Sequence, residues 1–448
     1  MFDKILIANR GEIALRVART CRELGIPMVA ICSTPDRGSA VTRIADETVL
    51  IGPGAAGQSY LNAAAVLQAA EQTGADAIHP GYGFLSESPD FAEACASLGI
   101  TLIGPPAEVM AALGDKSSAR AIMAKAGLPL LPGSVDPLDV DEARELATEI
   151  GFPVIVKAVA GGGGRGMSVV RDPDAFTDEF RRTQANAQML FADGRVYVEK
   201  YLEHARHVEV QVLADTRGRA IHLGARDCTV QRRHQKLIEE TPAPALPAGL
   251  AERIGASAVD GAVVAGYVGA GTWEFLLAPD GSYYFMEVNC RIQVEHPVTE
   301  MVTGVDLVRE QIAIAAGQPL ALGAADVVPR GVSIECRVNA EDPAARFAPA
   351  PGRLDRFEPP GGPFVRVDTH ASPGYVVPPH YDSMIAKLVV WAPDRAAAIA
   401  RMQRALGEFV IEGDRVRTTI DFLRTVLADE RFASAEHSTR LVDELLGP

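Results

Sequence analysis

Two glutamates face each other across a predicted β-hairpin, and their placement suggests metal chemistry. In TWEFLLAPDGSYYFMEVN, residues 272–289, Asp280 and Gly281 form a strong two-residue hairpin signal. A type I′ turn at these two residues places Glu274 directly opposite Glu287. Opposed side chains lie about 5 Å apart at Cβ, where like charges are destabilising. We therefore expect a hard divalent cation such as Mg²⁺ or Mn²⁺ between them. The alternative, a solvent-facing pair screened by water, fits poorly with so apolar a segment.

Polar and apolar residues alternate in the chain that follows the hairpin. If this stretch stays extended, its polar side chains all lie on one face. Asn289 would then extend the metal site, Arg291 would hold an anion and Glu295 would be a candidate base. An amphipathic strand that is wetted on one side would show the same alternation.

Cationic residues gather in an otherwise acidic chain. The segment RDCTVQRRHQKLIEE, residues 226–240, contains three arginines, a histidine and Lys236. A small anion or a phosphate would need such a local cationic wall. The segment could also be a solvated loop that pairs with Glu239 and Glu240. Arg337, in the strand SIECRVNAE, is similarly open to a structural ion pair or an anionic partner.

The segment KAVAGGGGRGMSVV, residues 157–170, places four consecutive glycines between two predicted strands. Glycine is costly to order, so the run favours a loop that moves or lets a ligand approach its backbone. It is not a dinucleotide fingerprint, because MSVV predicts a strand where a helix should begin. GDKSS is not a P-loop either, because Asp115 precedes Lys116. A hairpin that closes over a polyphosphate remains, with an ordinary flexible loop as the alternative.

The elements around these residues alternate between strand and helix. KILIANR predicts a strand and GEIALRVARTCRELG a helix that ends at Gly25, and the alternation continues to about residue 113. The 448 residues carry a net charge of −15, which argues against nucleic acid or a membrane surface as the main partner. The six cysteines contain no C-x-x-C pair and are expected to be free thiols. No signal peptide or membrane span is predicted, so we expect a cytoplasmic protein.

Several motifs together resemble the biotin carboxylase family of ATP-grasp enzymes, and the resemblance covers nearly the whole chain. They are IANRGEIALR, HPGYGFLSE, GDKSSAR, GGGGRGM, QRRHQK, RIQVEHPVTEM, ECRVNAEDP and PPHYDSMIAKL. The resemblance implies an α/β (α+β) ATP-grasp fold. It further implies a Rossmann-like N-terminal domain at 1–113, an ATP-grasp domain at 114–330 with a mobile lid at about 131–203, and a C-terminal domain at 331–446.

The resemblance also implies roles for individual residues. ATP would contact Lys116, Lys157, Gly163, Gly164, Glu199, Lys200, Tyr201, Leu202, His207, Gln231 and His234. The metal ligands would be Glu274, Glu287 and Asn289. The bicarbonate pocket would contain Lys236, Arg291, Gln293 and Val294, with Glu295 as the base and Arg337 beside biotin.

The implied reaction is the ATP-dependent carboxylation of biotin through carboxyphosphate. The implied partners are a biotin carboxyl carrier protein, carboxyltransferase subunits and a second copy of the chain. The sequence has no Met-Lys-Met biotinyl segment, so biotin is expected on a separate carrier or on a longer native chain. Two rivals remain: another ATP-grasp ligase, such as a carbamoyl-phosphate or purine-pathway enzyme, and a catalytically silent ATP-binding protein.

Overall fold

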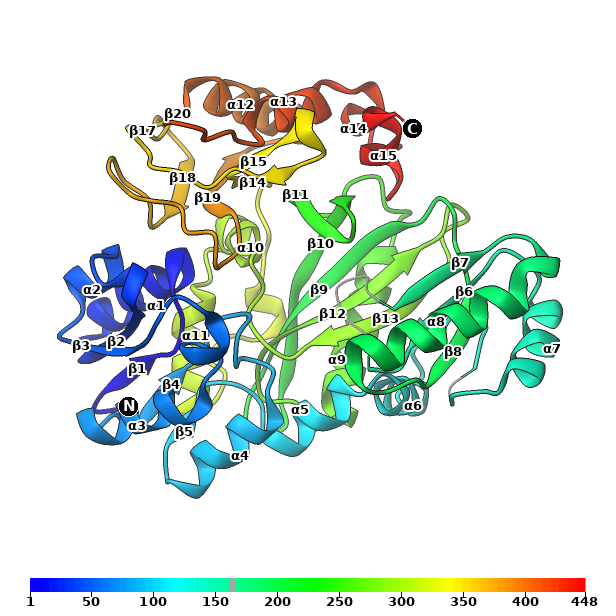
Figure 1. The fold of residues 1–448 in the computed structure, drawn as a ribbon, viewed down its shortest axis with the longest axis horizontal. Helices are drawn as coiled ribbons and strands as arrows, with labels where there is room; N and C mark the ends of the chain where they lie inside the picture. The colour runs from blue at the N-terminus through cyan, green and yellow to red at the C-terminus, as the bar shows by residue number, and fades with distance from the viewer. Residues whose placement is uncertain (135, 161–165, 448) are drawn as a thin grey trace.

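The computed structural model describes residues 1–134, 136–160 and 166–447. Its first part is a five-stranded parallel sheet in the order β3-β2-β1-β4-β5, with helices on its faces (Figure 1). This confirms the predicted strand and helix alternation. Helix α1 ends, as predicted, at Gly25, whose φ of 68° is the left-handed conformation that glycine adopts easily. The elements are β1 Ile5–Ile7, α1 Gly11–Leu24, β2 Met28–Ser33, α2 Ala40–Ile44, β3 Glu47–Gly52, α3 Ala63–Thr73, β4 Ala77–His79, α4 Pro89–Ser97, β5 Thr101–Leu102 and α5 Ala107–Gly114.

The segment predicted to be the lid contains a small sheet of its own, in the order β7-β6-β8. Strands β6 and β7 pair antiparallel, which confirms the strand predicted after the glycine run. The predicted phosphate donors Gly163 and Gly164 lie outside the described residues. Two helices cover this sheet and share an apolar core with it that includes Val156, Phe180 and Val198. The elements are α7 Val140–Ile150, β6 Val154–Ala158, β7 Met167–Val170, α8 Phe176–Phe191 and β8 Val196–Lys200.

The largest sheet has eight strands in the order β13-β12-β9-β10-β11-β14-β19-β18, and all its neighbouring pairs are antiparallel. Helices α6, α9, α10 and α11 pack against this sheet. The elements are α6 Lys116–Lys125, β9 Arg206–Ala214, β10 Ala220–Arg232, β11 Gln235–Thr241, α9 Leu250–Val264, β12 Gly269–Leu277, β13 Tyr283–Asn289, α10 His296–Thr303, α11 Leu307–Ala315, β14 Val332–Asn339, β18 Val365–Thr369 and β19 Met384–Ala392.

This sheet runs without a break across the domain boundary predicted at residue 330. Strands β11 and β14 lie on opposite sides of that boundary in sequence, yet they pair directly, with Ile238 opposite Cys336. One apolar core also spans it and contains Ile238, Ile334 and Leu388. The remaining elements are β15 Glu341–Asp342, β16 Ala348–Pro349, β17 Arg356–Glu358, α12 Arg395–Glu408, β20 Val410–Glu412, α13 Ile420–Ala428, α14 Glu430–Ala433 and α15 Leu441–Leu446.

The hairpin between β12 and β13 has a different turn from the predicted one. The Ala278 N–H donates to the Ser282 carbonyl at 2.8 Å, so the loop holds three residues instead of two. Gly281 has a φ of 85°, which suits the last position of a three-residue hairpin loop. The two-residue type I′ prediction was therefore wrong.

The predicted pairing of the two glutamates is nevertheless correct. Near the turn Phe275 pairs with Phe285, one residue out of the predicted register, but a β-bulge shifts the strands back. Glu274 therefore lies opposite Glu287, as expected. The extra loop residue shifts the strand register by one residue and the bulge shifts it back, so the two glutamates still face each other.

The extended strand predicted beyond Glu287 is also wrong. Strand β13 ends at Asn289, and Glu295 is the residue directly before α10. Pro297 near the start of this helix is compatible with the first turn, where a missing N–H costs nothing. The polar side chains of this segment still converge, but through a folded loop.

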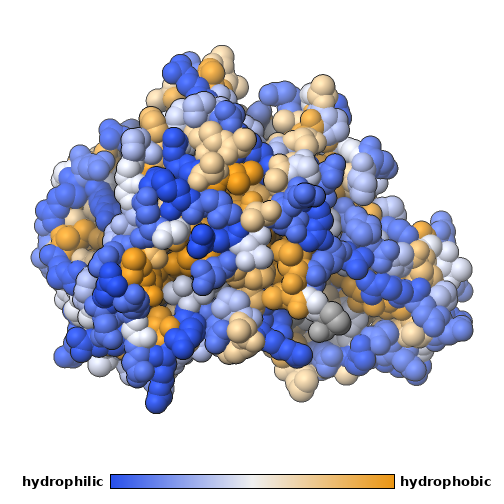
Figure 2. All heavy atoms as spheres, turned by 90° about the horizontal axis from the view of Figure 1, so that it is seen from above, coloured by the Kyte–Doolittle hydropathy of each residue, from blue (hydrophilic) through white to orange (hydrophobic). Residues whose placement is uncertain are grey.

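No helix among the described residues is long and apolar enough to span a membrane. Figure 2 shows hydrophilic residues over most of one face, with hydrophobic residues gathered toward its middle.

Candidate active site

A cleft of about 1260 Å³ lies between the three parts of the chain. Its walls include Asn9 and Tyr82 from the first part, Lys157 from the small sheet, and Glu274 and Arg337 from the large sheet. Most predicted site residues within the described part of the chain therefore line one space.

Three glutamates lie side by side on neighbouring strands at this cleft. Strand pairing places Glu274 of β12 opposite both Glu209 of β9 and Glu287 of β13. Glu209 is fully buried and Glu274 is only 3% exposed. Such a row of acids needs cations close by.

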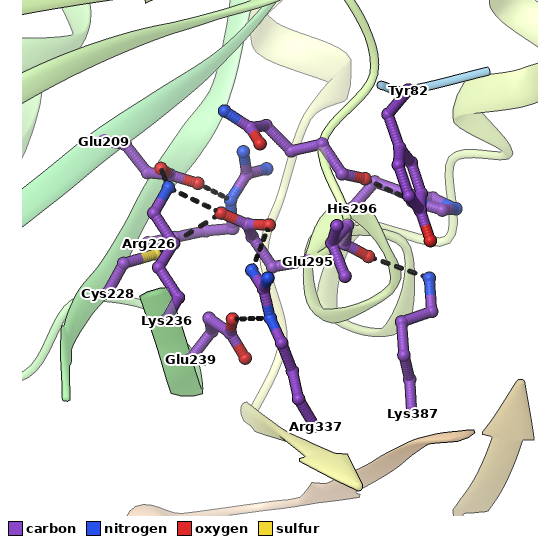
Figure 3. A network of polar contacts seen from close by, with 12 residues as sticks. Tyr82, Glu209, Arg226, Cys228, Lys236, Glu239, Glu295, His296, Arg337 and Lys387 are labelled. Atoms are coloured by element: carbon purple, nitrogen blue, oxygen red, sulfur yellow. Dashed lines mark hydrogen bonds and ion pairs between the residues drawn. The ribbon is translucent and has the colours of Figure 1, made fainter. Parts of the chain in front are cut away.

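Lys236 supplies one of these cations and contacts three carboxylates at once. Its Nζ lies 2.5 Å from Glu209 and 2.7 Å from Glu295 (Figure 3). It also lies 2.9 Å from Glu274. Burial alone would lower the pKa of Lys236, but the three carboxylates hold it well above its usual value. Lys236 is therefore charged.

The donor set beside this lysine fits a divalent cation. Burial and the neighbouring Glu274 raise the pKa of Glu287, and its side chain forms no hydrogen bond or ion pair with the described residues. Asn289 Nδ2 donates to Glu274 Oε1 at 2.8 Å, so its amide lies beside that carboxylate. Two carboxylates and one amide oxygen are hard ligands that suit Mg²⁺ or Mn²⁺. A cation there would also remove the like-charge repulsion between the glutamates.

Glu295 is fully buried, and two cations hold its carboxylate. Lys236 contacts one oxygen at 2.7 Å and Arg337 Nη2 donates to the other at 2.9 Å (Figure 3). Burial raises the pKa of Glu295, but Lys236 and then Arg337 hold it below its usual value. The carboxylate is ionised and can accept a proton.

Arg337 and Arg291 each have an acidic partner as well as an open side facing the cleft. Arg337 Nε donates to Glu239 at 2.5 Å. Arg291 Nε donates to Glu87 at 2.8 Å, and its other nitrogens reach Asn289 and Gln293 at 3.0 Å. Both guanidiniums are thus fixed in place beside the space where a small anion would bind.

Two further side chains extend the contacts of the acid row. His207 Nε2 lies 2.9 Å from Glu274, and Gln231 Nε2 lies 2.7 Å from His207 Nδ1. His234 lines the cleft from the turn between β10 and β11.

The predicted nucleotide residues fall into two groups. Lys116, Lys157, Lys200, Tyr201 and Leu202 line the cleft. The carboxylate of Glu199 instead lies behind it, where it accepts a hydrogen bond from Lys157 Nζ at 2.6 Å and pairs with Arg120. Glu199 therefore orients Lys157, and the side chains that line the cleft begin at Lys200.

The sequence analysis missed several residues at the site. Glu209 is one of them; its partner Arg226, already part of the predicted cationic segment, is buried with its Nε 2.6 Å from Glu209. The alternation of polar and apolar residues in HVEVQV, residues 207–212, was the available signal for Glu209. Glu87 and Lys387 reach the site only through long-range folding, so no local pattern could indicate them.

Comparisons with known proteins cover nearly the whole chain. Three family models match consecutive parts: "Biotin carboxylase, N-terminal domain" at 1–110, "Carbamoyl-phosphate synthase L chain, ATP binding domain" at 115–322 and "Biotin carboxylase C-terminal domain" at 335–444. The middle description names one of the rival ligases, whereas both flanking ones name biotin carboxylase.

Two curated relatives align over almost their full length. "Biotin carboxylase" of Nostoc sp. is 54% identical over 445 residues, covering 99% of each chain. A pyruvate carboxylase component of Methanothermobacter thermautotrophicus is 52% identical over 445 residues, covering 99% of this chain and 90% of the relative.

A solved structure is similarly close. It is the biotin carboxylase domain dimer of the Hydrogenobacter thermophilus 2-oxoglutarate carboxylase, in complex with MgADP, ADP and bicarbonate. It superposes with a TM-score of 0.95 at 47% sequence identity and covers 99% of this chain and 98% of its own.

Proposed function

The chain belongs to the biotin carboxylase family, and we propose that it carboxylates the biotin of a carrier protein, using ATP and bicarbonate. The observation that carries this proposal is Glu295, an ionised and fully buried base held between Lys236 and Arg337, which both line the cleft.

ATP would occupy the part of the cleft between the small and large sheets. Lys116 and Lys157 would contact its phosphates, together with the backbone of Gly163 and Gly164. The adenine would lie against the segment from Lys200 to Leu202. Glu274, Glu287 and Asn289 would hold Mg²⁺ or Mn²⁺, which would neutralise charge on the phosphate oxygens.

Bicarbonate would bind where Lys236, Arg291 and Gln293 converge beside the Val294 backbone. Glu295 would take its proton, and a bicarbonate oxygen would attack the γ-phosphorus of ATP, releasing ADP and forming carboxyphosphate. A water-free cleft would protect this intermediate from hydrolysis.

Transfer to biotin would follow in the same cleft. Carboxyphosphate would break down to carbon dioxide and phosphate, and the phosphate would accept the ureido proton of biotin. Arg337 would stabilise the negative charge that develops on the ureido oxygen, and the ureido nitrogen would then attack carbon dioxide.

The proposal extends to partners and location. A relative named for a pyruvate carboxylase and a solved domain dimer support assembly into a dimeric carboxylase. We propose a biotin carboxyl carrier protein and carboxyltransferase subunits as the specific partners. The cytoplasmic location stays a prediction from the sequence.

The test is bicarbonate-dependent release of ADP, with and without free biotin. We predict that Glu295→Ala abolishes the biotin-dependent release, because the base is lost, and leaves nucleotide affinity within about two-fold. Glu252→Ala, a change at a glutamate whose side chain is 83% exposed on α9, is the matched control. Isothermal titration with ADP and Mg²⁺ measures the affinity.

Three outcomes would contradict parts of this proposal. Unchanged turnover of Glu295→Ala would remove this residue as the base. A wild-type protein that is active only with an amine or amino acid would be a different ATP-grasp ligase. Nucleotide binding without any turnover would indicate the catalytically silent protein.

A further inference from the structure

Lys387 is a fully buried lysine whose ammonium lies beside the backbone of the predicted bicarbonate pocket. It belongs to β19, and its exposed fraction is 0%. Its Nζ contacts two groups distant in sequence: Glu12 Oε1 of α1 at 2.9 Å and the Val294 carbonyl oxygen at 2.8 Å. Figure 3 shows this lysine reaching toward the chain beside Glu295 and His296.

The charge of Lys387 is retained in spite of complete burial. Burial alone would lower the pKa of this lysine, but Glu12, followed by Glu335 and Asp368, raises it above its usual value. Glu335 of β14 is itself a buried acid, and burial raises its pKa well above the usual value. Asp368 of β18 is paired with Arg366 at 2.6 Å. Glu12 is therefore the main counter-charge of Lys387.

The other group that faces this lysine belongs to α10. Burial, and next Lys387 itself, keeps the pKa of His296 well below its usual value, so this ring is neutral. Its Nδ1 lies 2.8 Å from the Gln293 carbonyl. The loop before α10 is therefore held by two neighbouring contacts, one from His296 and one from Lys387.

The contact with Val294 fixes one peptide unit of the active site. In a trans peptide the carbonyl of one residue and the N–H of the next point in opposite directions. Holding the Val294 carbonyl against Lys387 therefore directs the Glu295 N–H to the other side. The same contact fixes the chain direction from which the Glu295 side chain leaves toward Lys236 and Arg337.

Glu12 connects this lysine to the mouth of the cleft. Its Oε1 accepts a hydrogen bond from the Tyr82 hydroxyl as well as the contact from Lys387. Tyr82 lines the cleft. The line Tyr82, Glu12, Lys387, Val294 thus joins the first part of the chain, the last part and the loop that carries Glu295.

We propose that Lys387 is a positioning residue for bicarbonate capture: it sets the Val294–Glu295 peptide and, through Glu12, ties that peptide to Tyr82. This inference rests on the proposed function, which places bicarbonate beside Val294 and makes Glu295 the base. Lys387 contacts neither substrate.

The test compares the KM values for bicarbonate and for ATP. Lys387→Met is expected to raise the bicarbonate KM at least ten-fold and to change the ATP KM less than three-fold. A purely structural role would change both KM values together, or only the amount of folded protein.

A double variant covers the case in which the single change prevents folding. Lys387→Gln with Glu12→Gln removes both charges and keeps an amide donor near Val294 and an amide oxygen near Tyr82. It is expected to fold and to recover bicarbonate affinity partly. Lys387→Met with Glu12→Gln, which lacks the donor, is expected to fold and to keep the raised bicarbonate KM. If the bicarbonate KM values of the two double variants equal that of the wild type, the proposal is overturned.

The matched control is a buried ion pair between the large sheet and a helix. Arg395 of α12 and Glu240 of β11 pair at 2.7 Å, and neither contacts Val294 or Glu12. Arg395→Gln with Glu240→Gln is expected to lower stability without separating the two KM values. A selective rise in the bicarbonate KM of this control would also contradict the proposal.

Hydrogen exchange provides a readout that does not depend on activity. Amides of the peptide spanning 290–300 should exchange at least five-fold faster in Lys387→Met with Glu12→Gln than in the wild type, while amides of α7 and α8 stay unchanged. If the wild type shows no bicarbonate-dependent turnover, the proposed function fails, and this measurement still decides the positioning role. Unchanged exchange at 290–300 would overturn it.

Discussion

Lys236 balances the charge of three buried glutamates, so its loss should have effects beyond a single missing contact. We predict that Lys236→Met lowers biotin-dependent ADP release at least 100-fold and moves the remaining activity to higher pH. The shift is upward because Lys236 lowers the pKa of Glu295. Without it, a smaller fraction of this base is ionised at a given pH. A pH–rate profile of the variant measures the effect.

The control for this prediction keeps the charge. Lys236→Arg should retain the wild-type pH dependence even where its rate is lower, since a guanidinium still faces the carboxylates. An unshifted profile in Lys236→Met would show that the other cations around Glu295 suffice to ionise it.

Sequence patterns and the family resemblance together indicated many of the charged residues that line the cleft. Glu274, Glu287 and Glu295 were all indicated by the pattern of one segment, the hairpin and the alternating residues after it. Their partners could not be predicted in the same way. Glu209 was hidden in a strand that reads as an ordinary amphipathic one, and Lys387 reaches Val294 only because β19 joins the large sheet.

The turn between β10 and β11 has a conformation that its residues disfavour. Arg233 and His234 have φ values of 49° and 65°, although neither is glycine. Two-residue hairpin loops with positive φ prefer Asn-Gly or Gly-Gly. Both residues line the cleft. The strained backbone of the turn therefore lowers the stability of the fold but places two side chains in the cleft.

We predict that Arg233→Gly raises stability by about 1 kcal/mol, because the left-handed conformation costs a side chain roughly that much. The same change should weaken nucleotide or anion binding, since a cation leaves the cleft. Thermal unfolding, followed by titration with ADP and Mg²⁺, measures both effects. Arg217→Gly, at an arginine in another hairpin loop, is the control for the loss of charge. A variant of Arg233 that is no more stable than wild type would show that the turn is not strained.

In the β12–β13 hairpin the turn was predicted wrongly, whereas the pairing of Glu274 with Glu287 was predicted correctly. The Asp-Gly signal indicated a tight turn, but the loop has three residues and a bulge follows. Turn length depends on local backbone geometry, whereas the facing of the two glutamates depends on which faces are buried. The bulge keeps the burial pattern, and the predicted pair with it.

At the scale of the molecule, Asp227 joins the C-terminal segment to the start of β9. Arg206 Nη2 lies 2.8 Å from one of its oxygens and His437 Nε2 lies 3.5 Å from the other. Nearby, the Thr439 N–H donates to the Ala205 carbonyl at 3.0 Å. Burial raises the pKa of Asp227, but His437 and Arg206 outweigh it and hold this pKa far below the usual value.

We predict that Asp227→Asn destabilises the fold by about 3 kcal/mol at pH 7, because it leaves the largely buried guanidinium of Arg206 without its counter-charge. A depressed pKa stabilises the folded state above the pKa of the unfolded chain, about 4, and this stabilisation is lost as the pH falls further. The difference between variant and wild type should therefore be full at pH 7 and smaller at pH 3.5.

Thermal midpoints at pH 7, 5 and 3.5 measure this difference. Asp421→Asn, at an aspartate whose side chain is 97% exposed, is the control and should change none of the midpoints appreciably. A difference that does not depend on pH would show that the packing of Asp227 matters more than its charge.

The pairing of β11 with β14 has a consequence for evolution and for engineering. A gene cut near residue 330 would give two fragments, each with a freshly bared strand edge that invites self-association. Joining the part before residue 330 of one homologue to the part after it of another would require the β11 and β14 edges to match residue by residue. The three-stranded sheet shares no strand pair with the eight-stranded one, so an exchange of this smaller sheet would leave the β11–β14 pairing intact.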